Sequence, residues 1–73
     1  MKNTMRLTIE IEQEEDGRWL SEVPQIPGVM VYGNSQKEAI LKVQSLALHV
    51  LADKLEHGET LINMDTFFSV VAA

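Results

Sequence analysis

The chain has 73 residues, of which 45% are hydrophobic and 23% charged, and its net charge at neutral pH is −5. This length accommodates one folded domain spanning residues 1–73, with a single small core. The absence of cysteine excludes disulfides and thiolate metal sites, and the acidity disfavours free nucleic acid, whose binding needs clustered Lys and Arg.

The first half of the chain predicts three short strands. Residues 5–12 alternate between apolar and polar side chains, which is the period of a half-buried strand. A turn containing Gly17 follows, and the alternation resumes in residues 18–23, so these two strands are expected to form an antiparallel hairpin. The segment 24–28 contains both prolines and cannot run through the centre of a sheet. The apolar residues 29–32 then predict a third strand.

The second half predicts one long helix and a final strand. Ser35, with Glu38 three residues later, has the form of a capping box. Helix-favouring residues continue from there to about residue 57, and Gly58 stands where a C-terminal cap belongs. Residues 66–71 are β-prone. The expected fold is therefore α+β with the order β-β-β-α-β, in which one helix packs on a small, mainly antiparallel sheet.

The predicted helix carries more apolar surface than one small sheet can cover. Residues from Ala39 to Leu51 at helical spacing form a face that suits the sheet, and Leu41, Leu48 and Leu55 lie beyond that face. A domain this small, without disulfides or a structural metal, gains stability by association with other chains. We therefore predict a homodimer or a dimer of dimers with Leu41, Leu48 and Leu55 at the oligomer interface.

Two sequence elements are specific in combination. The first is Pro-Gln-Ile-Pro-Gly at 24–28, and the second is Gly-Asn-Ser-Gln-Lys-Glu-Ala at 33–39. Their order and separation, after a hairpin turn with glycine, resemble the HicB antitoxin family over almost the whole chain. Val29 departs from the family pattern, because many members carry cysteine at this position.

The resemblance implies a partial ribonuclease H-like fold without ribonuclease H catalysis. It also implies a partner, a basic HicA-like toxin that cleaves mRNA with a histidine. Many family members continue into a C-terminal DNA-binding domain. Since this chain ends at Ala73, we expect the short form of the family, without direct binding of nucleic acid.

The expected function is that of an antitoxin in a type II toxin-antitoxin system, which binds the toxin and inhibits it sterically. Charge, and no family motif, selects the acidic residues among the candidate contacts. An acidic hairpin suits a basic RNA-binding surface, and Tyr32 fits either core packing or a protein interface, where tyrosine is favoured. The predicted toxin-contact residues are Glu10, Glu12, Glu14, Glu15, Asp16 and Tyr32, together with the exposed ends of the 24–28 loop.

Two alternatives remain open, a metal-dependent ribonuclease H-like nuclease and an orphan oligomeric scaffold. A nuclease needs several carboxylates converging on metal ions. Glu10 and Glu12 share one strand face and Glu22 could lie opposite them, although acids on an exposed hairpin are ordinarily solubilising. His49 and His57 have no third ligand at metal spacing. We therefore expect no enzymatic activity, no catalytic residue, no cofactor and no metal site.

The sequence contains no recognisable membrane-targeting signal. The N-terminal residues are polar and do not form an apolar signal region, and no stretch has the length and apolar character of a transmembrane helix. We expect a cytoplasmic protein that makes no membrane contact.

Overall fold

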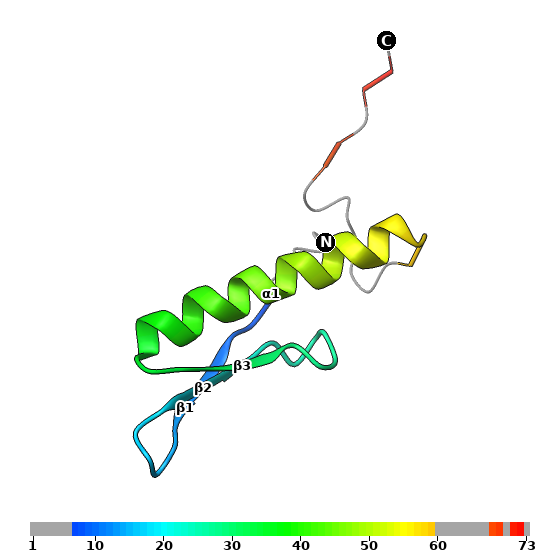
Figure 1. The fold of residues 1–73 in the computed structure, drawn as a ribbon. Helices are drawn as coiled ribbons and strands as arrows, with labels where there is room; N and C mark the ends of the chain where they lie inside the picture. Colours follow the sequence, from blue (N-terminus) through cyan, green and yellow to red (C-terminus); the bar gives the residue numbers. More distant parts are fainter. Residues whose placement is uncertain (1–6, 60–67, 70, 73) are drawn as a thin grey trace.

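The computed structural model describes residues 7–59, 68–69 and 71–72. In this part of the chain, three antiparallel strands are followed by one helix that lies across one face of the sheet, an α+β fold (Figure 1). The strands stand in the order β1-β2-β3, so each pairs with its neighbour in sequence. The elements are β1 Glu10–Gln13, β2 Trp19–Glu22, β3 Met30–Gly33 and α1 Gln36–Glu56. The predicted succession of three strands and a helix is confirmed.

β1 begins at Glu10, so residues 7–9 are not part of the strand, contrary to the prediction from sequence, and the predicted residues 5 and 6 lie outside the described part of the chain. In a continued register Thr8 would face Pro24, which has no N–H to donate to the ladder. Side-chain hydrogen bonds take the place of the ladder there. The N–H of Thr8 donates to Oε1 of Gln25 at 3.2 Å, and Nε2 of Gln25 donates to the Thr8 hydroxyl at 3.0 Å.

The core lies between α1 and one face of the sheet. Strand register places Ile11, Ser21 and Val31 side by side on this covered face. Ile26 reaches the same core from the proline-containing loop and is 1% exposed. The buried cluster consists of Val23, Ile26, Val29, Val43, Ala47 and Leu51. The loop that interrupts the strand pattern therefore contributes to the core.

The first turn of α1 sits directly on β2 and β3. The hydroxyl of Ser21, which is fully buried, donates to the carbonyl oxygen of Ala39 at 2.7 Å. A Cβ added to Gly33 would lie 2.5 Å from the backbone nitrogen of Ala39. Because a side chain larger than hydrogen would push the helix away, glycine at position 33 sets the distance between α1 and β3.

Both predicted ends of the helix are confirmed. The Ser35 hydroxyl accepts a hydrogen bond from the N–H of Glu38 at 3.0 Å, and the Glu38 carboxylate accepts one from the N–H of Asn34 at 2.6 Å. At the other end, Gly58 adopts a φ of +74°, and backbone bonds of the Schellman type close the last turn. In the described part of the chain, no helix combines the length and apolar character needed to cross a membrane.

The predicted final strand, 66–71, falls largely outside the described residues. Phe68, Ser69 and Val71 are described; they are exposed and belong to no strand. The strand across the remaining positions stays a prediction.

Candidate functional site

The face of the sheet opposite α1 is not covered by any described element (Figure 1). Two rows of side chains cross it, because residues paired across antiparallel strands point to the same side. One row consists of Glu12, Leu20 and Tyr32, and the other of Glu10, Glu22 and Met30. We call these six residues the open sheet face. It is acidic along β1 and apolar along β3, where Met30 and Tyr32 are 49% and 41% exposed.

Glu10 lies directly opposite Glu22 in the open sheet face. Two like charges in this position repel each other and destabilise the strand pair. A cationic group from a partner would offset that repulsion. Leu20 lies beside them, between Glu12 and Tyr32, and offers apolar area next to the charges. This combination suits a partner surface that presents Lys or Arg around an apolar contact.

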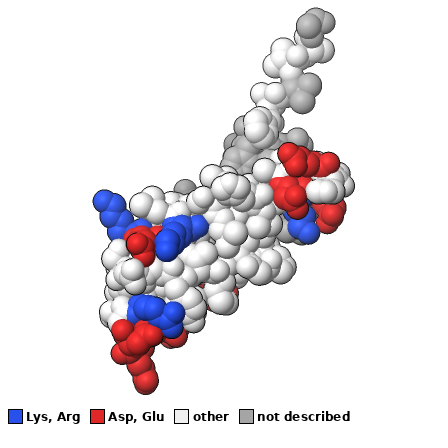
Figure 2. All heavy atoms as spheres, in the orientation of Figure 1, with Lys and Arg blue, Asp and Glu red and all other residues white. Residues whose placement is uncertain are grey.

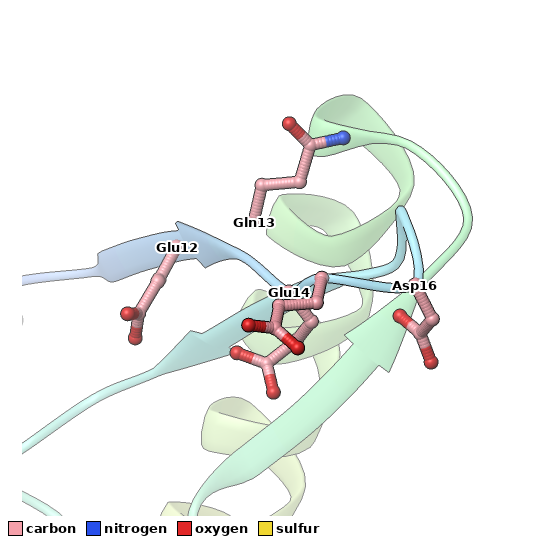
Figure 3. Close-up of a pocket in the computed structure, with 5 residues that line it drawn as sticks. Glu12, Gln13, Glu14 and Asp16 are labelled. Atoms are coloured by element: carbon pink, nitrogen blue, oxygen red, sulfur yellow. The ribbon is translucent and has the colours of Figure 1, made fainter.

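A shallow hollow of about 440 Å³ lies at the end of the β1–β2 hairpin (Figure 3). Its lining residues are Glu12, Gln13, Glu14, Glu15 and Asp16. Figure 3 shows Gln13 extending to one side of the hairpin and the carboxylates of Glu12 and Asp16 pointing to the other side. We call Glu14, Glu15 and Asp16 the acidic tip.

One arginine connects the acidic tip to the open sheet face. Nε of Arg18 donates to Oδ2 of Asp16 at 2.8 Å, and the backbone N–H of Arg18 donates to Oδ1 at 3.0 Å. These bonds hold the pKa of Asp16 below its ordinary value, and the backbone bond has the larger effect. The same guanidinium lies 4.2 Å from the centre of the Tyr32 ring. The tip therefore has one of its charges neutralised, while Glu14 and Glu15 extend from the same turn.

A second exposed surface lies on the helix. Leu41, Leu48 and Leu55, which we call the leucine stripe, are 58%, 65% and 43% exposed. All three stand outside the face of α1 that covers the sheet, as the sequence predicts. Figure 2 shows acidic side chains gathered over the hairpin end and over the C-terminal end of α1, with a broad uncharged surface between them.

The structure divides the predicted toxin-contact residues into two groups. Glu10, Glu12 and Tyr32 belong to the open sheet face, and the three remaining acids form the acidic tip. Sequence reasoning did not include Leu20 and Met30 among the contacts, and it considered Glu22 only as a nuclease carboxylate. The alternation along each strand could have identified these residues, because residues two positions apart on a strand share a face.

Each histidine ring lies close to the carbonyl oxygen of the residue four positions before it, His49 within α1 and His57 at its C-cap. Nδ1 of His49 lies 2.9 Å from the carbonyl oxygen of Ser45, and Nδ1 of His57 lies 2.8 Å from that of Asp53. A carbonyl oxygen only accepts, so in both rings Nδ1 carries the proton. Among residues 7–59, 68–69 and 71–72, no three His, Asp or Glu side chains are placed to hold a metal ion together.

Comparison with known proteins identifies one similar protein, whose name gives no activity. UPF0150 protein Ta0767 of Thermoplasma acidophilum is 28% identical to this chain over 57 residues, which is 78% of this chain and 83% of the relative. No family model and no solved structure matches the chain. The chain is therefore similar to a UPF0150 protein over most of its length.

Proposed function

We propose that this protein is an antitoxin that binds a basic, HicA-like mRNA-cleaving toxin and inhibits it by covering its RNA-binding surface. The observation that carries the proposal is the repulsive pair of Glu10 and Glu22 beside exposed apolar residues on the open sheet face. A surface that binds RNA supplies the Lys and Arg residues that would offset this repulsion. Inhibition of this kind is steric, so it requires neither catalysis nor a cofactor from this chain.

The two acidic groups would have different tasks in such a complex. The acidic tip lies at the far end of the hairpin, where long-range attraction guides a basic partner before contact (Figure 1). The open sheet face provides the contact itself, with Tyr32 and Met30 as apolar anchors. Because the toxin's substrate is mRNA, the complex would act in the cytoplasm.

The resemblance to the HicB family supports the proposal through the fold. The 24–28 element brings Ile26 into the core, and the 33–39 element contains the N-cap Ser35 and the close approach at Gly33. These elements therefore build the scaffold that presents the open sheet face.

The proposal is tested with a HicA-like toxin encoded in the neighbouring reading frame. We expect the purified chain to suppress RNA cleavage by this toxin at equimolar ratio. The double variant Glu10→Gln/Glu22→Gln removes two charges from the open sheet face and should raise the dissociation constant at least about tenfold. The control Asp53→Asn/Glu59→Gln removes two charges at and just beyond the C-terminal end of α1. This control should leave the dissociation constant within about twofold of the unaltered value.

Two results would contradict the proposal. If no basic neighbour binds the chain, the antitoxin function is wrong and an oligomeric scaffold takes its place. If the purified chain itself cleaves RNA with Mg²⁺ or Mn²⁺, and Glu10→Gln abolishes the cleavage, the protein is a nuclease.

A further inference from the structure

The leucine stripe follows α1 at a spacing of seven residues. At 3.6 residues per turn, successive members drift by only about 20° around the helix, so they form a nearly straight line. The line lies about 120° around the axis from the buried residues of α1. The 21-residue helix is about 31 Å long, and the stripe from Leu41 to Leu55 occupies about 21 Å of it. This is the geometry of a helix that pairs with another helix.

Two open hollows border the stripe. One, of about 390 Å³ beside Leu41, is lined by Gln36, Lys37, Ile40 and Leu41. The other, of about 350 Å³ beside Leu48, is lined by Leu7, Ile9, Val23, Gln44, Ala47 and Leu48. Spaces between side chains of this kind receive apolar side chains from a facing helix. The stripe thus offers both protruding leucines and places to receive them.

We infer that the leucine stripe pairs with the stripe of a second copy of this chain in antiparallel orientation, with the two-fold axis near Leu48. In this arrangement each Leu41 lies opposite Leu55 of the second copy. The hollow beside Leu41 then receives that leucine, and the two Leu48 side chains meet at the axis.

The charges beside the stripe select the antiparallel orientation. Lys37 stands near the start of the stripe and Glu56 near its end, and neither makes an ion pair among the described residues. Antiparallel pairing brings Lys37 of one copy toward Glu56 of the other, and it also opposes the two helix dipoles. Parallel pairing would place Lys37 beside Lys37 and Glu56 beside Glu56.

The pairing has a consequence for the proposed complex. α1 covers one side of the sheet, and the open sheet face is on the other side. Two copies joined through their leucine stripes therefore keep both open sheet faces accessible. One pair of chains would therefore bind two toxin molecules, and this consequence alone rests on the proposed function.

The absence of native cysteine allows a direct test by disulfide cross-linking. Leu48→Cys should cross-link to itself in high yield, because its two copies meet at the axis. Leu41→Cys mixed with Leu55→Cys should give the mixed dimer, whereas Leu41→Cys alone should not cross-link. His49→Cys, one residue along on another side of α1, serves as the matched control and should form no disulfide cross-link. These outcomes follow from the short Cα separation that a disulfide requires.

Mass measurement by light scattering provides the second test. At about 50 µM we expect twice the 8.2 kDa of one chain, or four times if two such pairs associate. Leu48→Glu should reduce the mass to one chain with an unchanged circular dichroism spectrum. Lys37→Glu should weaken pairing about threefold, and adding Glu56→Lys should restore it.

Either of two results would overturn the inference. One is a single-chain mass for the unaltered protein, and the other is stronger cross-linking of Leu41→Cys with itself than with Leu55→Cys. Neither measurement involves a toxin, so failure of the proposed function leaves these results unaffected.

Discussion

The guanidinium of Arg18 lies 4.2 Å from the centre of the Tyr32 ring, across the end of the sheet where the hairpin turn closes. Asp16 holds the same guanidinium through a 2.8 Å hydrogen bond. A cation over an exposed aromatic ring contributes about 0.5–1 kcal/mol. The three side chains therefore link the acidic tip to the open sheet face, and a partner that contacts Tyr32 also meets Arg18.

The link between Asp16 and Arg18 makes the hairpin sensitive to acid. The backbone N–H of Arg18, and then its side chain, lower the pKa of Asp16 from the ordinary value of 3.8. Because the pKa is lowered by folding, the carboxylate stabilises the hairpin above pH 3.8, and that contribution is lost as pH falls through the lowered value. Titration of the Asp16 carboxyl by NMR should give a midpoint below 3.8. In Asp16→Asn the Arg18 Nε–H signal should lose this transition, and a midpoint at or above 3.8 would contradict the expectation.

The buried hydroxyl of Ser21 is expected to contribute measurably to stability. Ser21→Ala removes the 2.7 Å hydrogen bond to the Ala39 carbonyl oxygen at a fully buried site. We expect the free energy of unfolding in urea to fall by about 1 kcal/mol. Ser45→Ala, an exposed position on α1, is the control and should change it by less than about 0.5 kcal/mol. Equal effects at the two positions would show that the buried bond makes no net contribution.

Gly33 is expected to tolerate no larger residue without loss of stability. The Cβ of Gly33→Ala would lie 2.5 Å from the nitrogen and 2.8 Å from the Cα of Ala39, so α1 must shift away from β3. Overpacking of this kind costs about 1–3 kcal/mol, which thermal unfolding would register as a clear fall in melting temperature. At Gly17, with a φ of +91° and open space around it, Gly17→Asn should cost about 1 kcal/mol or less. A smaller loss at Gly33 than at Gly17 would rule out the steric explanation.

The acidic tip and the open sheet face should affect different rates of toxin binding. The triple variant Glu12→Lys, Glu14→Lys, Glu15→Lys reverses the charges that attract a basic partner, so association should slow much more than dissociation accelerates. Truncation of the apolar anchors, as Tyr32→Ala or Met30→Ala, should instead raise the dissociation rate. Surface plasmon resonance separates the two rates.

Salt provides the internal control for this kinetic difference. Charge attraction is screened over about 8 Å at physiological ionic strength, so added salt should slow association of the unaltered chain. The same salt should leave association of the triple variant nearly unchanged or slightly faster. If the triple variant changes only the dissociation rate, the acidic tip makes direct contacts and does not guide the partner.

Local sequence signals were sufficient for the helix and the turns. Ser35 and Gly58 mark the ends of α1 because capping bonds connect residues only a few positions apart. The hairpin was predictable for the same reason, since Gly17 takes the positive φ that the turn requires. The excess apolar surface of the helix was also visible from its periodicity, and Leu41 and Leu48 are indeed exposed.

Relations between distant residues were decided only by the tertiary structure. The β1–β2 register sets Glu10 against Glu22, and a slip of one residue would turn every side chain of a strand to the other face. The start of β1 depends on Pro24, which removes a ladder donor from the neighbouring chain segment. The need for glycine at position 33 appears only once Ala39 is placed above it. The sequence by itself determined the order of elements and the acidic, apolar-rich character of the chain, because short-range bonds and periodicity encode them. Strand pairing and helix docking decided which acids share a surface with Tyr32, because those contacts join residues far apart along the chain.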